Sequence, residues 1–304
     1  MKNFLILLSP FNSKEDMPSI LFVLKKVLAF VLIYFVSTIL AEAMAILIHY
    51  IMGYNILKGE MMNFEAMTLL KYYGYAIFMA VAILYCKLIE GRSPRSMGFN
   101  NKISHYIKGI LVAIILIAIS ISLISLTGNI TYKGVLRNIN FPLILAFLCA
   151  FIIQGAMEET LCRGFLMTSL SKKVPISLAI LISSLAFTVP HFSSLFKSDT
   201  LYSLVGILNL LLVSIIFSLL MINYENIWIA CGMHSFWNFC IFNILGLNLS
   251  GSEKESISIF DFSTTNENIL NGGTYGIEAS AITTIVLFFY LIFLIFKFKK
   301  AKVK

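Results

Sequence analysis

Two adjacent carboxylates, Glu158 and Glu159, stand near the end of a long apolar stretch and are followed by Arg163. A charged side chain near the bilayer centre costs roughly 3 kcal/mol on insertion scales. Three such side chains so close together therefore indicate that the protein needs them for its function. On a helix, positions i and i+4 share a face, and we expect Glu159 and Arg163 to pair. Glu158 is then left without a cationic partner, which suits it to take a proton from water near neutral pH. An interfacial charge network that ends the helix is the alternative interpretation.

Two further apolar stretches each contain a histidine. His191 follows Pro190, and a proline in a spanning helix is tolerated where the helix lines a cavity. His234 and Asn238 lie at i and i+4, so both can point at one place and donate hydrogen bonds to a developing oxyanion. Taken singly, His191 and the pair His234 and Asn238 are each better explained as packing residues between transmembrane helices. Taken together with the carboxylates, they predict one polar site built from three helices.

The elements that must position this site are transmembrane helices. The chain has 304 residues, of which 59% are hydrophobic and 12% are charged, and its mean hydropathy is +0.90. This composition is typical of a polytopic membrane protein, and lipid leaves no partner for open sheet edges. We therefore predict an all-α polytopic transmembrane helix bundle with about eight spans. The eight apolar windows are Val27–Ile51, Met67–Cys86, Ile107–Leu126, Pro142–Glu159, Pro175–Phe196, Leu201–Ile222, Ile227–Leu247 and Ile277–Phe296.

The basic residues predict the orientation of the bundle. Of 23 lysines and arginines, 17 fall in four clusters beside apolar stretches, as the positive-inside rule describes. The net charge of +8 is thus explained by membrane topology, and we predict no nucleic-acid partner. Both termini are expected in the cytoplasm, with a cytoplasmic segment at 1–26, a transmembrane domain at 27–296 and a basic tail at 297–304. A composition rich in Lys, Asn and Ile favours a bacterial plasma membrane as the location.

Three motifs carry a resemblance to a known family. Glu-Glu-x-x-x-Arg at 158–163, Phe-x-x-x-His at 187–191 and His-x-x-x-Asn at 234–238 follow one another in this order. Together they resemble the signature of the CPBP family, intramembrane proteases named for CAAX and bacteriocin processing that include the type II CAAX prenyl endopeptidases. The resemblance covers roughly residues 140–250 as a catalytic core, with the stretch 95–99 as weaker support. It implies hydrolysis of a peptide bond in a membrane cavity that is open to the cytosol.

The resemblance also implies a role for each motif residue. Glu159 and Arg163 would be structural, and four residues would be catalytic. Glu158 would activate the attacking water, His191 would help to hold that water, and His234 with Asn238 would stabilise the tetrahedral oxyanion.

The cofactor is left open between zinc and none. Glu158, His191 and His234 could supply three zinc ligands with one open position, and the family is customarily labelled a metalloprotease. However, the sequence contains no His-Glu-x-x-His motif, and a water activated by glutamate needs no ion. We favour the glutamate-dependent chemistry.

The expected partners are the lipid bilayer and a peptide or protein substrate at the membrane. A CAAX-type protein, a bacteriocin leader and a pheromone precursor are all open as substrates. Two other function classes compete with a protease. The first is a non-proteolytic scaffold or a bacteriocin self-immunity protein. The second is a proton-coupled transporter that uses Glu158 and the histidines as a relay, although the sequence shows no internal repeat of the transporter kind.

Overall fold

The computed structural model describes residues 10, 17–251 and 257–302. It is a bundle of long helices with one small two-stranded sheet, so the predicted all-α polytopic fold class is confirmed. The long helices are α2 (Ser19–Ile51), α3 (Phe64–Leu88), α4 (Ser104–Leu126), α5 (Phe141–Glu159), α7 (Ile176–Thr188), α9 (Thr200–Tyr224), α10 (Trp228–Phe239) and α11 (Ala281–Lys302). The shorter helical elements are η1 (Ile56–Lys58), η2 (Pro94–Met97), η3 (Thr160–Met167), α6 (Thr168–Leu170), η4 (Val189–His191), α8 (Phe192–Leu195), η5 (Cys240–Leu245), η6 (Gly273–Tyr275) and η7 (Ile277–Ala279).

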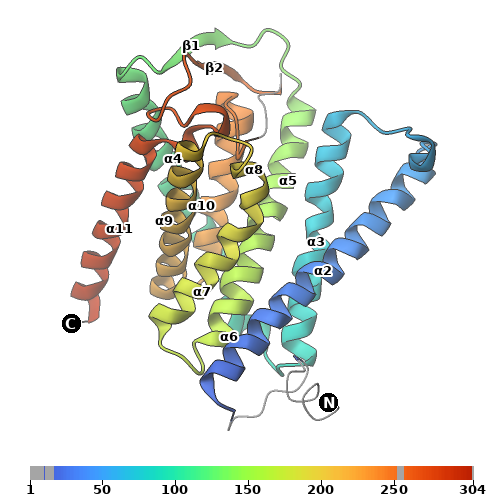
Figure 1. Ribbon diagram of the computed structural model, residues 1–304, viewed down its shortest axis with the longest axis vertical. Coiled ribbons are helices and arrows are strands. Elements are labelled where there is room, and N and C mark those ends of the chain that lie inside the picture. Colours follow the sequence, from blue (N-terminus) through green and yellow to red (C-terminus); the bar gives the residue numbers. More distant parts are fainter. Residues whose placement is uncertain (1–9, 11–16, 252–256, 303–304) are drawn as a thin grey trace.

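Each of the eight apolar windows coincides with helical structure. Within the described residues, six helices are long and apolar enough to cross a membrane. Successive long helices run alternately up and down in Figure 1, so α2 begins and α11 ends towards the lower part of the view. The count of eight spans and the cytoplasmic placement of both termini stay predictions.

The first spanning helix begins earlier than the sequence windows place it. Helix α2 starts at Ser19, directly after Pro18, so residues 19–26 of the expected N-terminal segment are helical. Residues 1–9 and 11–16 of that segment, and residues 303–304 of the expected tail, lie outside the described part of the chain. The division into three segments is not tested further by the structure.

Polar caps set where three of the helices begin. Asn63 accepts a hydrogen bond from the backbone nitrogen of Ala66 at the start of α3, and Asn140 accepts one from Leu143 at the start of α5. Asp199 does the same for α9. Such side chains satisfy N–H groups that the first helical turn leaves unpaired. The helices that these caps begin, α3, α5 and α9, all start towards the upper end of the bundle in Figure 1.

A short antiparallel sheet covers that upper end (Figure 1). Strand β1 (Ile130–Val135) follows α4 and pairs with β2 (Phe260–Thr264), with Ile130 opposite Thr264. Both strands lie between the predicted spans. The partner strands are separated by more than a hundred residues, and a local sequence pattern does not predict such a long-range pairing.

Glycines bring α10 into close contact with its neighbours. A Cβ on Gly232 would lie 2.1 Å from the carbonyl oxygen of Tyr106 in α4, and one on Gly155 would lie 2.9 Å from the backbone nitrogen of Ser235. Small residues of this kind allow membrane helices to approach backbone to backbone. Helix α5, which carries the two glutamates, is therefore held directly against α10, which carries His234.

Candidate active site

The two motif glutamates lie where α5 passes into the wide π-helical turn η3. Glu159 is completely buried, whereas the side chain of Glu158 is 19% exposed. Turns of the π type recur at functional sites because they redirect side chains within an otherwise regular helix. The adjacent carboxylates therefore enter two different environments.

Glu159 forms the ion pair that the helical spacing predicts. Arg163 Nη1 lies 3.0 Å from Glu159 Oε1, and both side chains are fully buried. The other end of the guanidinium donates to the carbonyl oxygen and the hydroxyl of Ser214 in α9, at 3.0 and 2.5 Å. The same group lies over the rings of Phe187 and Phe217, 4.7 and 5.2 Å from their centroids. These contacts join α5, α7 and α9 behind the site.

His234 is held between the two carboxylates. Its Nδ1 lies 3.0 Å from Glu159 Oε1, and its Nε2 lies 3.8 Å from Glu158 Oε2. The imidazole also stacks on Phe217, with a centroid separation of 5.1 Å and an interplanar angle of 15°. Because the ion-paired Glu159 carboxylate is an acceptor, Nδ1 carries the proton and donates it. The free edge of the ring, Nε2, is thereby turned towards Glu158.

Glu158 is connected to Asn238 through a glutamine that the sequence analysis passed over. Gln154 Nε2 donates to Glu158 Oε1 at 2.7 Å, and Asn238 Nδ2 donates to Gln154 Oε1 at 2.9 Å. The second oxygen, Glu158 Oε2, is buried and has no hydrogen-bond partner among the described residues. One amide hydrogen of Asn238 is thus committed to Gln154 rather than free for an oxyanion. The position of Gln154, one turn before Glu158 in an apolar stretch, was the signal available in the sequence.

His191 reaches the site from the 3-10 turn η4 at the end of α7. Its Nδ1 lies 3.0 Å from the carbonyl oxygen of Phe187, the residue four positions earlier. A carbonyl oxygen only accepts, so Nδ1 is the protonated nitrogen and Nε2 keeps a lone pair. Pro190 precedes His191 in this turn, and both residues line the same open space.

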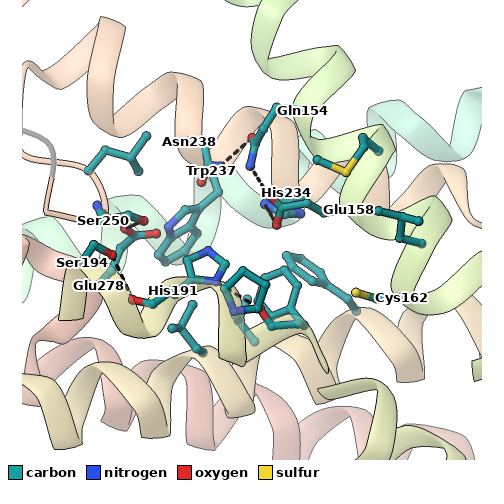
Figure 2. A pocket seen from close by; sticks show the side chains of 18 of the residues that line it. Gln154, Glu158, Cys162, His191, Ser194, His234, Trp237, Asn238, Ser250 and Glu278 are labelled. Carbon is teal, nitrogen blue, oxygen red and sulfur yellow. Dashed lines mark hydrogen bonds and ion pairs between the residues drawn. The ribbon is translucent and has the colours of Figure 1, made fainter. Parts of the chain in front are cut away.

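That space is a cavity of about 440 Å³. Figure 2 shows Glu158, His191, His234 and Asn238 around it, with Gln154 bridging two of them. The structure therefore brings the four predicted catalytic residues to one place, while Glu159 and Arg163 stand behind them. The wall formed by α2 and α3 adds three phenol groups, Tyr34, Tyr72 and Tyr75.

The cavity extends towards the end of the bundle that carries the sheet. Its lining includes Ser250 and Glu278 near that end, and it includes no residue of the loops 87–106 and 163–174, which carry two of the basic clusters. In the predicted topology those loops are cytoplasmic. The lining thus does not support the expected opening towards the cytosol.

Zinc is the alternative that the sequence leaves open at this site. Within the described part of the chain, no group of three or more His, Cys, Asp or Glu side chains is arranged to hold a metal. Glu158, His191 and His234 line one cavity, but they are not such a group, and zinc binding by this set stays a prediction. What these side chains do provide is a carboxylate base, two oriented imidazoles and amide donors.

Comparison with known proteins places this constellation in a family context. Residues 140–240 match the family model described as Rce1-like, type II CAAX prenyl endopeptidase Rce1-like. No curated protein and no solved structure matches the chain. The matched segment contains all three motifs and every one of the six predicted site residues. Over residues 140–240 the chain is thus similar to the Rce1-like type II CAAX prenyl endopeptidases, which confirms the resemblance given by the motifs and supports an intramembrane protease.

Proposed function

We propose that this protein is an endopeptidase that hydrolyses a peptide bond of a membrane-associated or leader-bearing substrate with a water molecule activated by Glu158. The observation that carries the proposal is the buried oxygen Glu158 Oε2, which has no hydrogen-bond partner among the described residues and lies 3.8 Å from His234 Nε2, in a residue that lines the cavity. A separation of that length is too long for a direct hydrogen bond, but it suits a bridging water.

In the first step, Glu158 takes a proton from this water as its oxygen attacks the carbonyl carbon of the scissile bond. His191 supports the water, because the lone pair on its Nε2 accepts the second O–H. Gln154 keeps the Glu158 carboxylate in place through its 2.7 Å hydrogen bond to Oε1. The products of this step are a protonated Glu158 and a tetrahedral intermediate that carries an oxyanion.

His234 and Asn238 stabilise that oxyanion. A protonated His234 presents its Nε2–H to the cavity while its Nδ1–H stays on Glu159. Asn238 offers the amide hydrogen that Gln154 does not use. Preorganised donors of this type lower the barrier because they need no rearrangement as charge develops. When the intermediate collapses, the carbon–nitrogen bond breaks and Glu158 returns its proton to the departing amine.

The decisive experiment compares two carboxylates within the membrane domain. Full-length protein in nanodiscs is incubated with a synthetic peptide library, with and without a lipid chain, and cleavage is read by mass spectrometry. We expect Glu158→Gln to lower cleavage by about 10³-fold, the usual scale for loss of a general base. Glu42→Gln is the matched control, since Glu42 lies on the exposed side of α2 and does not line the cavity.

The mechanism is wrong if Glu158→Gln or His191→Ala cleaves at the wild-type rate. Full biological activity of a correctly inserted Glu158→Gln variant would instead favour a non-proteolytic scaffold or immunity protein. Proton-coupled uptake into proteoliposomes that Glu158→Gln abolishes would favour a transporter.

A further inference from the structure

A second carboxylate, Glu278, lines the same cavity as Glu158. It belongs to the short turn η7, directly before α11, and therefore lies outside the three motifs and outside the segment 140–240. Figure 2 shows it beside Ser250 and Ser194, on the side of the cavity where His191 lies. The proposed hydrolysis makes no use of this group.

The turn that carries Glu278 is fixed by buried contacts. Asn209 of α9 donates from Nδ2 to the carbonyl oxygens of Glu278 and Ser280, at 2.9 and 3.1 Å. Gly276 has φ of +100° and packs so closely that a Cβ there would lie 2.3 Å from the carbonyl oxygen of Asn248. A side chain at position 276 would meet both a steric and a conformational penalty. The backbone around Glu278 is thus held in one arrangement.

The carboxylate itself is oriented through only one of its oxygens. Oε2 accepts hydrogen bonds from the backbone nitrogen of Ser250 at 2.8 Å and from its hydroxyl at 2.7 Å. Oε1 has no hydrogen-bond partner among the described residues, and it is not a fully buried atom. This oxygen therefore faces open space in the cavity, ready to accept from a ligand.

No ion pair neutralises Glu278 within the described residues. Apart from the two histidines of the site, the charged residues that share the cavity lining are Glu158, which has the same sign, and Lys71 of α3, which forms no ion pair within 4.0 Å. A fixed, uncompensated carboxylate in a partly desolvated cavity attracts a cationic hydrogen-bond donor and repels an anionic one.

We propose that Glu278 is a substrate-binding subsite for a positively charged group, a lysine or arginine side chain or a free amine, at a set distance from the scissile bond. The proposal deepens the proposed function and rests on it: the substrate class becomes a peptide with a basic residue near its cleavage site. Ser250 and Asn209 are the positioning residues that hold the carboxylate towards the cavity.

The test measures binding rather than cleavage, so that it does not depend on turnover. Full-length Glu158→Gln protein in phosphatidylcholine nanodiscs is incubated with an equimolar decapeptide library, and bound peptides are eluted and sequenced. In this background Glu278 is the one carboxylate among the cavity-lining residues. We expect bound peptides to be enriched in Lys and Arg at one position by about tenfold, as one charge-assisted hydrogen bond allows.

Adding Glu278→Gln should reduce this enrichment to the level of empty nanodiscs, and Glu278→Lys should replace it with enrichment in Asp and Glu. Lys71→Gln should increase the basic enrichment, because it removes the competing lysine of the cavity. Glu267→Gln, an exposed carboxylate of the 248–272 loop that does not line the cavity, is the matched control and should change nothing.

The subsite is refuted if the background protein shows no basic enrichment, or if the enrichment survives Glu278→Gln. It is also refuted if Glu267→Gln removes the enrichment equally well. Failure of the proposed function is read from different results: wild-type protein that does not cleave, or cleavage at the wild-type rate by Glu158→Gln or His191→Ala.

Discussion

Two glutamates of this membrane protein, Glu90 and Glu158, have opposite hydrogen-bonding environments. Glu90 follows α3, and its side chain is 4% exposed. Lys26 lies 2.5 Å from its Oε1, Arg92 lies 2.8 Å from its Oε2, and the hydroxyl of Ser169 is within 3.0 Å of both oxygens. Glu158, in contrast, has one donor on Oε1 and none on Oε2.

In the proposed mechanism, this difference separates a structural carboxylate, Glu90, from a reactive one, Glu158. Arg92 extends the Glu90 cluster by donating to Ser169, Thr168 and the carbonyl oxygen of Gly164, so the cluster joins α2, the end of α3 and α6. A buried charge whose acceptors are all occupied stabilises one arrangement of helices and has nothing left to offer a substrate. At Glu158, Oε2 is buried but has no hydrogen-bond partner among the described residues, so it keeps the capacity to accept a proton beside the cavity that this residue lines.

The largest effect that would test this comparison is on stability, at Glu90. We expect Glu90→Gln to lower the free energy of unfolding by about 3 to 5 kcal/mol, because it leaves Lys26 and Arg92 buried without a carboxylate. Thermal unfolding in detergent measures the change. Glu158→Gln should unfold close to the wild-type temperature, since Glu158 lines an open cavity. The comparison breaks if Glu158→Gln is the less stable of the two variants.

The next effect is on rate, at Gln154. Replacing this residue by methionine keeps the side-chain volume but removes the donor that holds Glu158 and the acceptor that holds Asn238. We expect cleavage to slow by about 10- to 100-fold, as is usual when a residue that orients a catalytic group is lost. Rates are compared with those of Cys149→Ser, an exposed position on the same helix. An unchanged rate would mean that Glu158 does not need this support.

A smaller effect is expected from acid, and it should be confined to the Glu90 cluster. Burial by itself raises the pKa of Glu90, but Lys26 and Arg92 outweigh it and hold the pKa below the ordinary value of 4.5. A carboxylate with a lowered folded-state pKa stabilises the fold above its unfolded pKa, and that contribution is lost as the pH falls through the folded value.

The unfolding temperature of the wild type should therefore drop below about pH 4.5 more than that of Glu90→Gln, which lacks this group. Unfolding curves recorded for both proteins from neutral to acidic pH measure the difference. Parallel curves for the two proteins would show that Glu90 does not contribute in this way.

The helices were largely predictable, because hydropathy over about 20 residues depends only on local sequence. The sheet was not, since Ile130 finds its partner at Thr264, far along the chain. The burial of Arg92 was not predictable for the same reason. As one of the basic residues beside apolar stretches it indicates orientation, but its burial against Ser169 depends on how α6 packs.

The site was predictable where the motifs cover it. Glu158, His191, His234 and Asn238 were named from spacing and residue type, and the fold places them around one cavity. Gln154 was missed because a single glutamine carries little weight in an apolar run. Glu278 was missed for a different reason: it is a single acidic residue at the start of the predicted span Ile277–Phe296, and only the tertiary structure brings the turn η7 to the cavity.

The smallest expected effect is that of metal removal, which tests whether Glu158 is a general base or a metal ligand. A zinc ligand would be pinned by its ion, whereas the geometry shows Glu158 held by Gln154 and no metal-holding group among the described residues. We therefore expect cleavage to change by less than about twofold after dialysis against 1,10-phenanthroline, with a zinc protease in the same buffer as positive control. Loss of cleavage that added zinc restores, together with metal bound in proportion to protein, would place Glu158 among metal ligands instead. In that case its free oxygen would be a coordination position and not the base.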